Sequence, residues 1–321
     1  MRVFVAGATG VLGRRVVRQL VARGHVAVGL TRSESGDATV RSLGGEPRRA
    51  DLFDADALAR AAEGCSVVIH AATAIPTKVR TRPKDWDMND RIRREGTRAL
   101  TTAAGRVGAG AYLQQSVVWA VRGPEGALFD EDAPAAGDPI LASALEGERI
   151  ARDAGAKHGF RAAILRCGGF YSADGWHTRI LAESLFRGRP VLVDGGTAVW
   201  SWLHAEDAAS AFVAASEWPK RGVWHVVDDR PASLREFLGL LAEKLGTRPP
   251  RQVSRSLLRL FVGRYTAGLL AASFPTSNAR FRSDFRWTAS FPTFEKGLGE
   301  VVAAWRSEGF PGRQVPRTRG G

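Results

Sequence analysis

Short, wholly apolar runs alternate along the first two thirds of the chain with longer stretches in which apolar residues recur every three or four positions. The short runs predict buried strands, and the longer stretches predict amphipathic helices. The predicted strands are 3–6, 25–30, 46–49, 66–71, 111–115, 161–165 and 223–227. The predicted helices are 12–23, 55–62, 85–107, 141–154 and 205–216. This alternation predicts an α/β fold of Rossmann type, with a doubly wound parallel sheet.

The pattern changes after residue 166, where Gly, Trp and Arg become frequent. We therefore predict a Rossmann domain over 1–166, with 201–229 rejoining its sheet. The segments 167–200 and 230–308 are predicted to form a smaller C-terminal substrate-binding region. In such a sheet, ligands bind at the carboxyl ends of the strands.

Composition narrows the range of partners. The net charge is +13, but 40 of the 46 basic residues are arginines, and they are scattered without a basic run. We therefore expect no nucleic-acid partner and no membrane partner. Two cysteines give neither a disulfide framework nor a metal cluster, so a reducing, cytoplasmic location is expected and no metal site is predicted. The tail 309–321, rich in Pro, Gly and Arg, is expected to be disordered.

A glycine-rich turn separates the first strand from the first helix, with the sequence Gly7-Ala8-Thr9-Gly10-Val11-Leu12-Gly13. Strand, glycine turn and helix together are typical of a dinucleotide-binding loop. The first glycine permits the tight turn, the second lets the backbone approach the pyrophosphate, and the third lets helix and sheet pack closely. The amides of residues 9–12 and the helix dipole favour the anion. The predicted phosphate-binding residues are Gly7, Thr9, Gly10, Val11, Leu12 and Gly13.

The end of the second strand bears on the choice between NAD and NADP. NAD sites usually place a carboxylate there, and NADP sites an arginine. This chain has Arg32 between Thr31 and Ser33, which predicts NADP(H) binding through the 2′-phosphate. Arg14 and Arg15 are expected to add positive charge nearby. Glu34 can still reach a ribose hydroxyl, so NAD stays open.

Several further landmarks occur in a fixed order and resemble the extended short-chain dehydrogenase/reductase family of the epimerase/dehydratase type. They are Asp51-Leu52, His70-Ala71-Ala72, Glu95-Gly96-Thr97, Leu165-Arg166, Phe170-Tyr171, Trp202 to Ala209 and Phe285-Arg286-Trp287. The resemblance implies that Asp51 and Leu52 lie along the adenine. It also implies that His70, Ala71, Ala72 and Thr73 line the cofactor site. A homodimer built on helices 85–107 and 141–154 is implied as well.

The family's reactive pair, a Tyr followed four residues later by a Lys, is missing. Residues four positions after the three tyrosines (Tyr112, Tyr171 and Tyr265) are Ser116, Gly175 and Leu269. Ile140 stands in the Tyr place and Ala144 in the Lys place. Arg93 replaces the family's Asn upstream of Gly-Thr. The chain is therefore identified as an atypical member.

Three residues are candidates to replace the missing proton donor. Ser116 can hydrogen-bond a carbonyl, Tyr171 follows the sixth strand, and His177 titrates near neutrality. Each also has a structural interpretation: a strand-end serine, a wall aromatic and a surface histidine. Glu146 and Glu148 are expected on the solvated or dimer-facing surface of their helix.

Three functions fit these residues. The first is an NADP(H)-dependent oxidoreductase of a small organic substrate. The second is a non-redox cyclase, isomerase or dehydratase that keeps the cofactor as a scaffold, and the third is a non-catalytic NADP(H)-binding sensor. Trp176, Trp200 and Trp202 in the second region favour a small aromatic or apolar ligand over the sensor.

Overall fold

A sheet of seven parallel strands forms the centre of the molecule, in the order β11-β6-β5-β4-β1-β2-β3. The computed structural model describes residues 1–78 and 80–310. The strands are β1 (Arg2–Ala6), β2 (Val26–Thr31), β3 (Glu46–Arg49), β4 (Val67–His70), β5 (Ala111–Val117), β6 (Arg161–Cys167) and β11 (Gly222–Val226). The predicted α/β fold with a doubly wound parallel sheet is confirmed.

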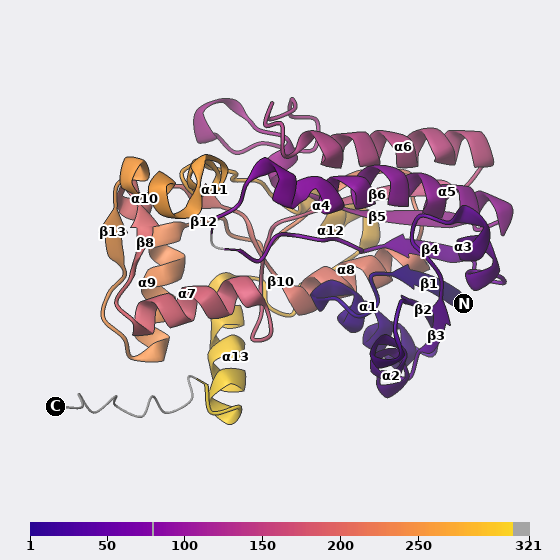
Figure 1. The fold of residues 1–321 in the computed structure, drawn as a ribbon, viewed down its shortest axis with the longest axis horizontal. Helices are drawn as coiled ribbons and strands as arrows, with labels where there is room; N and C mark the ends of the chain where they lie inside the picture. The colour runs from indigo at the N-terminus through magenta and orange to yellow at the C-terminus, as the bar shows by residue number, and fades with distance from the viewer. Residues whose placement is uncertain (79, 311–321) are drawn as a thin grey trace.

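Helices cover both faces of this sheet (Figure 1). They are α1 (Val11–Ala22), α2 (Glu34–Ser42), α3 (Ala55–Ala61), α4 (Asp87–Arg91), α5 (Thr97–Arg106), α6 (Ala142–His158) and α8 (Ala205–Glu217). Alternate side chains of β1 divide between two cores. Val3 and Val5 pack with the apolar residues of α1 and α8, whereas Phe4 and Ala6 pack with those of α3 and α5. This alternation follows from the two-residue period of a strand.

Helix α2 is absent from the predicted elements because its sequence has little apolar periodicity. It is anchored mainly by Val40, which is buried, and by Ser33, whose hydroxyl accepts a hydrogen bond from the Gly36 amide at 3.2 Å. A side-chain N-cap of this kind supplies a partner for an otherwise free amide of the first turn.

The predicted helix 85–107 is divided into several helical types. A 3₁₀ turn, η1 (Pro83–Trp86), leads into α4, a π-helical turn, η2 (Ile92–Gly96), and α5. π-helical turns are rare and frequently lie at functional sites. Here the turn contains Arg93, at the position where the family has Asn.

The second region carries its own small sheets and a separate apolar core. Its strands are β7 (Gly169–Tyr171), β8 (Pro190–Val193), β9 (Val199–Trp200), β10 (Trp202–His204), β12 (Ala232–Ser233) and β13 (Arg251–Val253), which pair as β7–β10, β8–β13 and β9–β12. Its helices are α7 (Trp176–Phe186), α9 (Leu234–Leu245), α10 (Arg255–Val262), α11 (Arg264–Leu270), α12 (Ala279–Phe285) and α13 (Phe294–Ser307). Short 3₁₀ turns are η3 (Val118–Ala120), η4 (Pro124–Gly126) and η5 (Asp194–Gly196). Helices α7, α9, α10 and α11 gather at one end of the molecule, away from β1 to β3 (Figure 1).

The start of the tail is ordered, so the prediction of disorder over 309–321 is wrong for its first two residues. The Phe310 amide donates to the Trp305 carbonyl at 2.9 Å, and its ring packs against Trp305 and Phe186. Residues 311–321 lie outside the described residues. Among the described residues, no helix has the length and apolar character needed to cross a bilayer.

Candidate active site

Two of the three glycines in the loop lie in close contact with neighbouring backbone. Gly7 has φ +87°, and a Cβ there would lie 2.6 Å from the carbonyl carbon of Ala71. A Cβ on Gly13 would lie 2.0 Å from the Gly7 oxygen. A Cβ on Gly10, by contrast, would meet only the Gly7 oxygen, at 3.3 Å. Gly7 and Gly13 are thus required by packing, whereas Gly10 presents an open backbone.

The first turn of α1 suits an anion. Its N-cap is Gly10, so no side chain caps the first amides, and the turn contains no acidic residue. Thr9 and Gly10 are exposed, Val11 is partly buried and Leu12 is buried. Uncapped amides together with the helix dipole favour an anion, which is what a phosphate-binding loop requires.

The first turn of α2, which follows β2, lies beside the glycine loop. Cγ2 of Thr9 is 3.5 Å from the position that a Cβ on Gly36 would occupy. Arg32 is exposed and forms no ion pair with another described residue, which leaves its guanidinium available to a ligand. The neighbouring Asp37 is instead paired with Arg49 at 2.6 Å, and this pairing lowers the pKa of Asp37.

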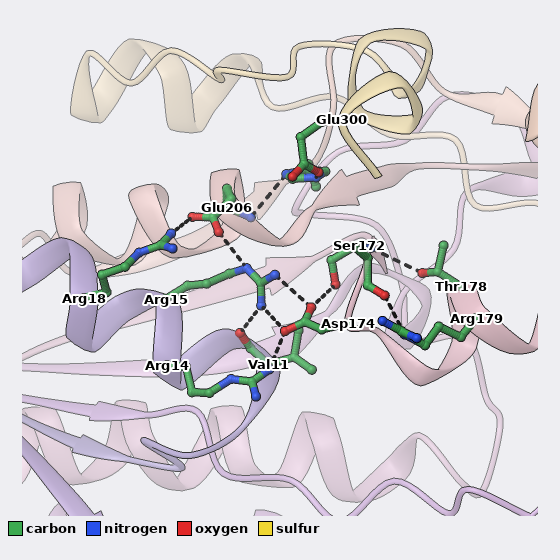
Figure 2. A network of polar contacts seen from close by, with 12 residues as sticks. Val11, Arg14, Arg15, Arg18, Ser172, Asp174, Thr178, Arg179, Glu206 and Glu300 are labelled. Atoms are coloured by element: carbon green, nitrogen blue, oxygen red, sulfur yellow. Dashed lines mark hydrogen bonds and ion pairs between the residues drawn. The ribbon is translucent and has the colours of Figure 1, made fainter. Parts of the chain in front are cut away.

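Arg14 and Arg15 do not add free positive charge beside the ribose, and this prediction is wrong. Figure 2 shows Arg15 between two carboxylates: its Nη2 is 2.8 Å from Asp174 and its Nε is 2.9 Å from Glu206. Arg14 also pairs with Asp174. Because Asp174 lies just before α7, its pairs with both arginines fasten α1 to the second region, whereas the Arg15–Glu206 pair joins α1 to α8.

The remaining predicted cofactor residues follow β3 and β4. Leu52 is buried against α5, and Asp51 is exposed, with one oxygen accepting from the Phe53 amide at 3.0 Å. After β4, Ala71 is buried, Ala72 is partly buried and Thr73 is exposed. The contact of Gly7 with Ala71 and Ala72 brings this segment against the glycine loop.

Ser116 belongs to a buried polar triad with Glu148 and Arg166. It is the register partner of Arg166 across β5 and β6, and its Oγ is 2.6 Å from Oε1 of Glu148 on α6. Arg166 binds the same carboxylate twice, at 2.9 and 2.8 Å, and donates to the Glu131 carbonyl at 2.9 Å. An ionised carboxylate only accepts hydrogen bonds, so Ser116 is the donor in its contact with Glu148.

Glu148 is therefore not a surface residue, and that expectation is wrong. Its side chain is 2% exposed, whereas that of Glu146 is 31% exposed and pairs with Arg94 and Arg98. The signal that could have identified the pair is Arg166, a charged residue in an otherwise apolar strand. A buried cation needs a carboxylate partner.

Apolar residues occupy the positions of the missing Tyr and Lys, and their surroundings in the structure are at least partly buried. Ala144 is buried among Val117, Ala120 and Leu141, and Ile140 is partly buried just before α6. Neither side chain can donate or accept a proton. The two positions of the family's reactive pair therefore supply no acid here.

The other two candidate acids lie in different environments. Tyr171 is 1% exposed, and its hydroxyl donates to Asp228 at 2.9 Å. Burial raises the pKa of this phenol far above its ordinary value, and burial also raises the pKa of Asp228 to about 8. His177 is exposed at the start of α7 and stacks on Trp176. This arrangement supports a structural role for Tyr171 and a surface position for His177.

Aromatic residues gather just beyond Ser116. The ring of Trp119 lies 6.0 Å from that of Trp200 and 6.5 Å from that of Phe274. Trp119 also packs against the apolar start of α6, whereas Trp202 stacks on Phe237 within the core of the second region. Trp119 was not among the predicted site residues. Trp119 and Trp200 are partly exposed and are able to contact an aromatic ligand.

Comparison with known proteins identifies the family. Residues 3–227 match the model of the NAD dependent epimerase/dehydratase family, and the chain belongs to this family. A "3-diazoavenalumate denitrifying reductase" from Streptomyces sp is 33% identical over 306 residues, covering 93% of this chain and 99% of that protein. A quinoline-oxide ketoreductase from Stigmatella aurantiaca is 29% identical, and the match covers 81% of this chain and 79% of that protein.

Solved structures show the same fold. Human epimerase family protein SDR39U1 with NADPH has a TM-score of 0.80 at 22% identity, covering 94% of this chain and 99% of that chain. The Thermus thermophilus UDP-glucose 4-epimerase with NAD has a TM-score of 0.77 at 24% identity, covering 95% and 99%. The predicted resemblance to extended short-chain dehydrogenases/reductases is thus confirmed.

Proposed function

We propose that the protein is an NADPH-dependent reductase that transfers hydride to a small aromatic substrate whose acceptor atom needs no proton from the enzyme. The observation that carries this proposal is the hydrogen bond that the Ser116 hydroxyl donates to Glu148. The hydroxyl hydrogen is committed to Glu148 at 2.6 Å, while Ile140 and Ala144 offer no donor at the family's reactive positions.

This arrangement is poorly suited to the reduction of a carbonyl group. Hydride addition to a carbonyl places negative charge on oxygen, and that charge must be met by a donor or an acid. Ser116 instead presents oxygen lone pairs to a ligand, because its hydrogen is already used. Lone pairs stabilise an electron-poor or cationic centre, so the site favours such an acceptor over a ketone.

A diazo group fits this requirement and is named in the activity of the Streptomyces relative. In an arenediazonium ion, hydride from NADPH forms an N–H bond at the terminal nitrogen, which yields an aryldiazene and NADP⁺. The aryldiazene then breaks its C–N bond and releases N₂, while its hydrogen is passed to the ring carbon. Overall, arenediazonium and NADPH give arene, N₂ and NADP⁺, with no net proton required. We propose that the substrate is of this kind, held against Trp119 and Trp200.

The rate of NADPH oxidation with two matched substrates tests this proposal. 4-Carboxybenzenediazonium is expected to give enzyme-dependent NADP⁺ and benzoate in equal amounts, above the rate of an enzyme-free control. 4-Acetylbenzoate, which offers a ketone on the same ring, is expected to give no rate above buffer. Faster oxidation with the ketone than with the diazonium would refute the proposal.

NADP(H) is the proposed cofactor because Arg32 directly follows β2, is exposed and has no carboxylate partner among the described residues. Arg32→Asp is expected to weaken NADPH binding about ten- to a hundredfold, the effect of losing a charge-assisted hydrogen bond. NADH binding should be retained or improved. Calorimetric titration of both cofactors measures this, with Arg41→Asp on the exposed side of α2 as a control. Equal affinity of the wild-type protein for both cofactors would contradict the assignment.

We further propose a homodimer through α5 and α6, as the family resemblance implies. Light scattering that reports a monomer at micromolar concentration would exclude it.

A further inference from the structure

Arg93 lies where the π-helical turn η2 crosses α6. Its carbonyl oxygen would be 2.7 Å from a Cβ on Gly147, so helix and turn approach closely at this point. Its Nη1 donates to the Ser143 hydroxyl at 3.3 Å, and that hydroxyl donates in turn to Asp90 at 2.6 Å. Ser143 directly precedes Ala144 in the first turn of α6, so Arg93 contacts the same helical turn that carries the family's Lys position.

This guanidinium has few partners inside the chain. It carries five N–H donors, yet the long contact with Ser143 is its one side-chain hydrogen bond to a described residue, and it forms no ion pair with a described carboxylate. Its neighbour Arg94 differs, because it pairs with Glu146 at 2.5 Å. Arg93 is partly buried, and burial lowers its pKa to about 10 while Asp90 and Glu148 act in the opposite direction. The side chain is therefore charged at neutral pH, and its desolvation is poorly compensated.

The surroundings of Arg93 are those of the candidate active site. Its charge acts on His70 at the end of β4, whose pKa is lowered to about 4, chiefly by burial and further by Arg93. Gly147, which the Arg93 carbonyl oxygen approaches, directly precedes Glu148, the carboxylate that holds Ser116. The turn that carries Arg93 thus contacts both the carboxyl end of β4, where Nε2 of His70 is 3.4 Å from the Ile92 carbonyl oxygen, and the part of α6 that precedes Glu148.

We propose that Arg93 binds a carboxylate of the substrate, so that the protein takes aromatic carboxylates. A guanidinium presents paired donors that match the two oxygens of a carboxylate. The aromatic part would lie against Trp119 and Trp200, beyond Ser116. The proposal rests on the proposed function in placing the substrate at this site, but it concerns binding rather than turnover.

Binding of two matched probes to the NADP⁺-loaded protein tests this assignment. Calorimetry is expected to show that cinnamate binds at least about tenfold more tightly than cinnamamide, which lacks the charge. Arg93→Gln should abolish that difference. The control Arg94→Gln removes the adjacent arginine, which is already paired with Glu146, and should preserve the difference.

Other outcomes would overturn the proposal. These are equal binding of the two probes by the wild type, no cinnamate binding at millimolar concentration, or an Arg93→Gln variant that keeps the preference but binds NADP⁺ more weakly. A purely structural arginine predicts a lower Tm for Arg93→Gln, whereas a poorly compensated binding residue predicts an unchanged or higher Tm. A cinnamate preference in a protein that never oxidises NADPH would refute the proposed reaction and leave Arg93 assigned.

Discussion

Replacing Arg166 with methionine is expected to lower the free energy of unfolding by about 3–5 kcal/mol, the usual cost of breaking a buried ion pair. Glu148 would then lose its cationic partner at a position that is 2% exposed, with only Ser116 as a side-chain partner. Urea denaturation monitored by tryptophan fluorescence measures the change. A loss below about 1 kcal/mol would mean that the pair does not stabilise the fold in this way.

Two controls separate the charge effect from lost packing. Arg94→Met breaks the half-exposed pair with Glu146 and is expected to cost no more than about 1 kcal/mol. The double replacement Arg166→Met with Glu148→Met removes both buried charges and should recover much of the stability lost by the single variant. If the double variant is as unstable as Arg166→Met alone, packing rather than the uncompensated charge accounts for the loss.

Restoring the family's reactive pair is expected to create carbonyl reduction. Ile140→Tyr, in the turn before α6, together with Ala144→Lys, in its first turn, restores an acid and a cation at the family's two positions. An acid of this kind contributes about 10²–10⁴-fold in rate. Reduction of 4-acetylbenzoate should therefore rise by up to that factor over the wild type. Ala144 is buried, so the added volume is expected to cost about 1–3 kcal/mol of stability.

Each single variant is the control for this pair. Tyr without Lys lacks the charge that lowers its pKa, so Ile140→Tyr alone should gain much less. Ala144→Lys alone adds no proton donor near neutrality. A folded double variant that binds NADPH normally but shows the wild-type ketone rate would indicate that something other than the missing pair prevents carbonyl reduction.

Local sequence patterns account for most of the fold. The apolar runs that became β1, β4 and β6 are continuous, and such runs are typical of strands covered on both faces. The glycine loop was predictable because a side chain would collide with nearby backbone at Gly7 and Gly13, so the local geometry requires glycine there. Helix α2 escaped prediction because it is short and mostly polar, with Val40 as its main anchor.

The site was less predictable because its contacts join distant segments. Glu148 reaches Ser116 and Arg166 only through the rotation of α6 against β5 and β6. Tyr171 finds its partner Asp228 57 positions away, and Arg15 finds Glu206 191 positions away. The hydrophobic periodicity of a single helix or strand does not indicate side-chain contacts between residues so far apart in the sequence. A charged residue inside an apolar strand, such as Arg166, is the one local signal that pointed toward them.

The central claim is that hydride leaves NADPH for an acceptor that takes no proton from the protein in the same step. Isotope effects on single-turnover NADPH oxidation by 4-carboxybenzenediazonium test it most directly. The reaction should slow with NADPH deuterated at both C4 positions and should be unchanged when H₂O is replaced by D₂O. A rate that is insensitive to deuterated NADPH, or one that falls in D₂O, would contradict this account.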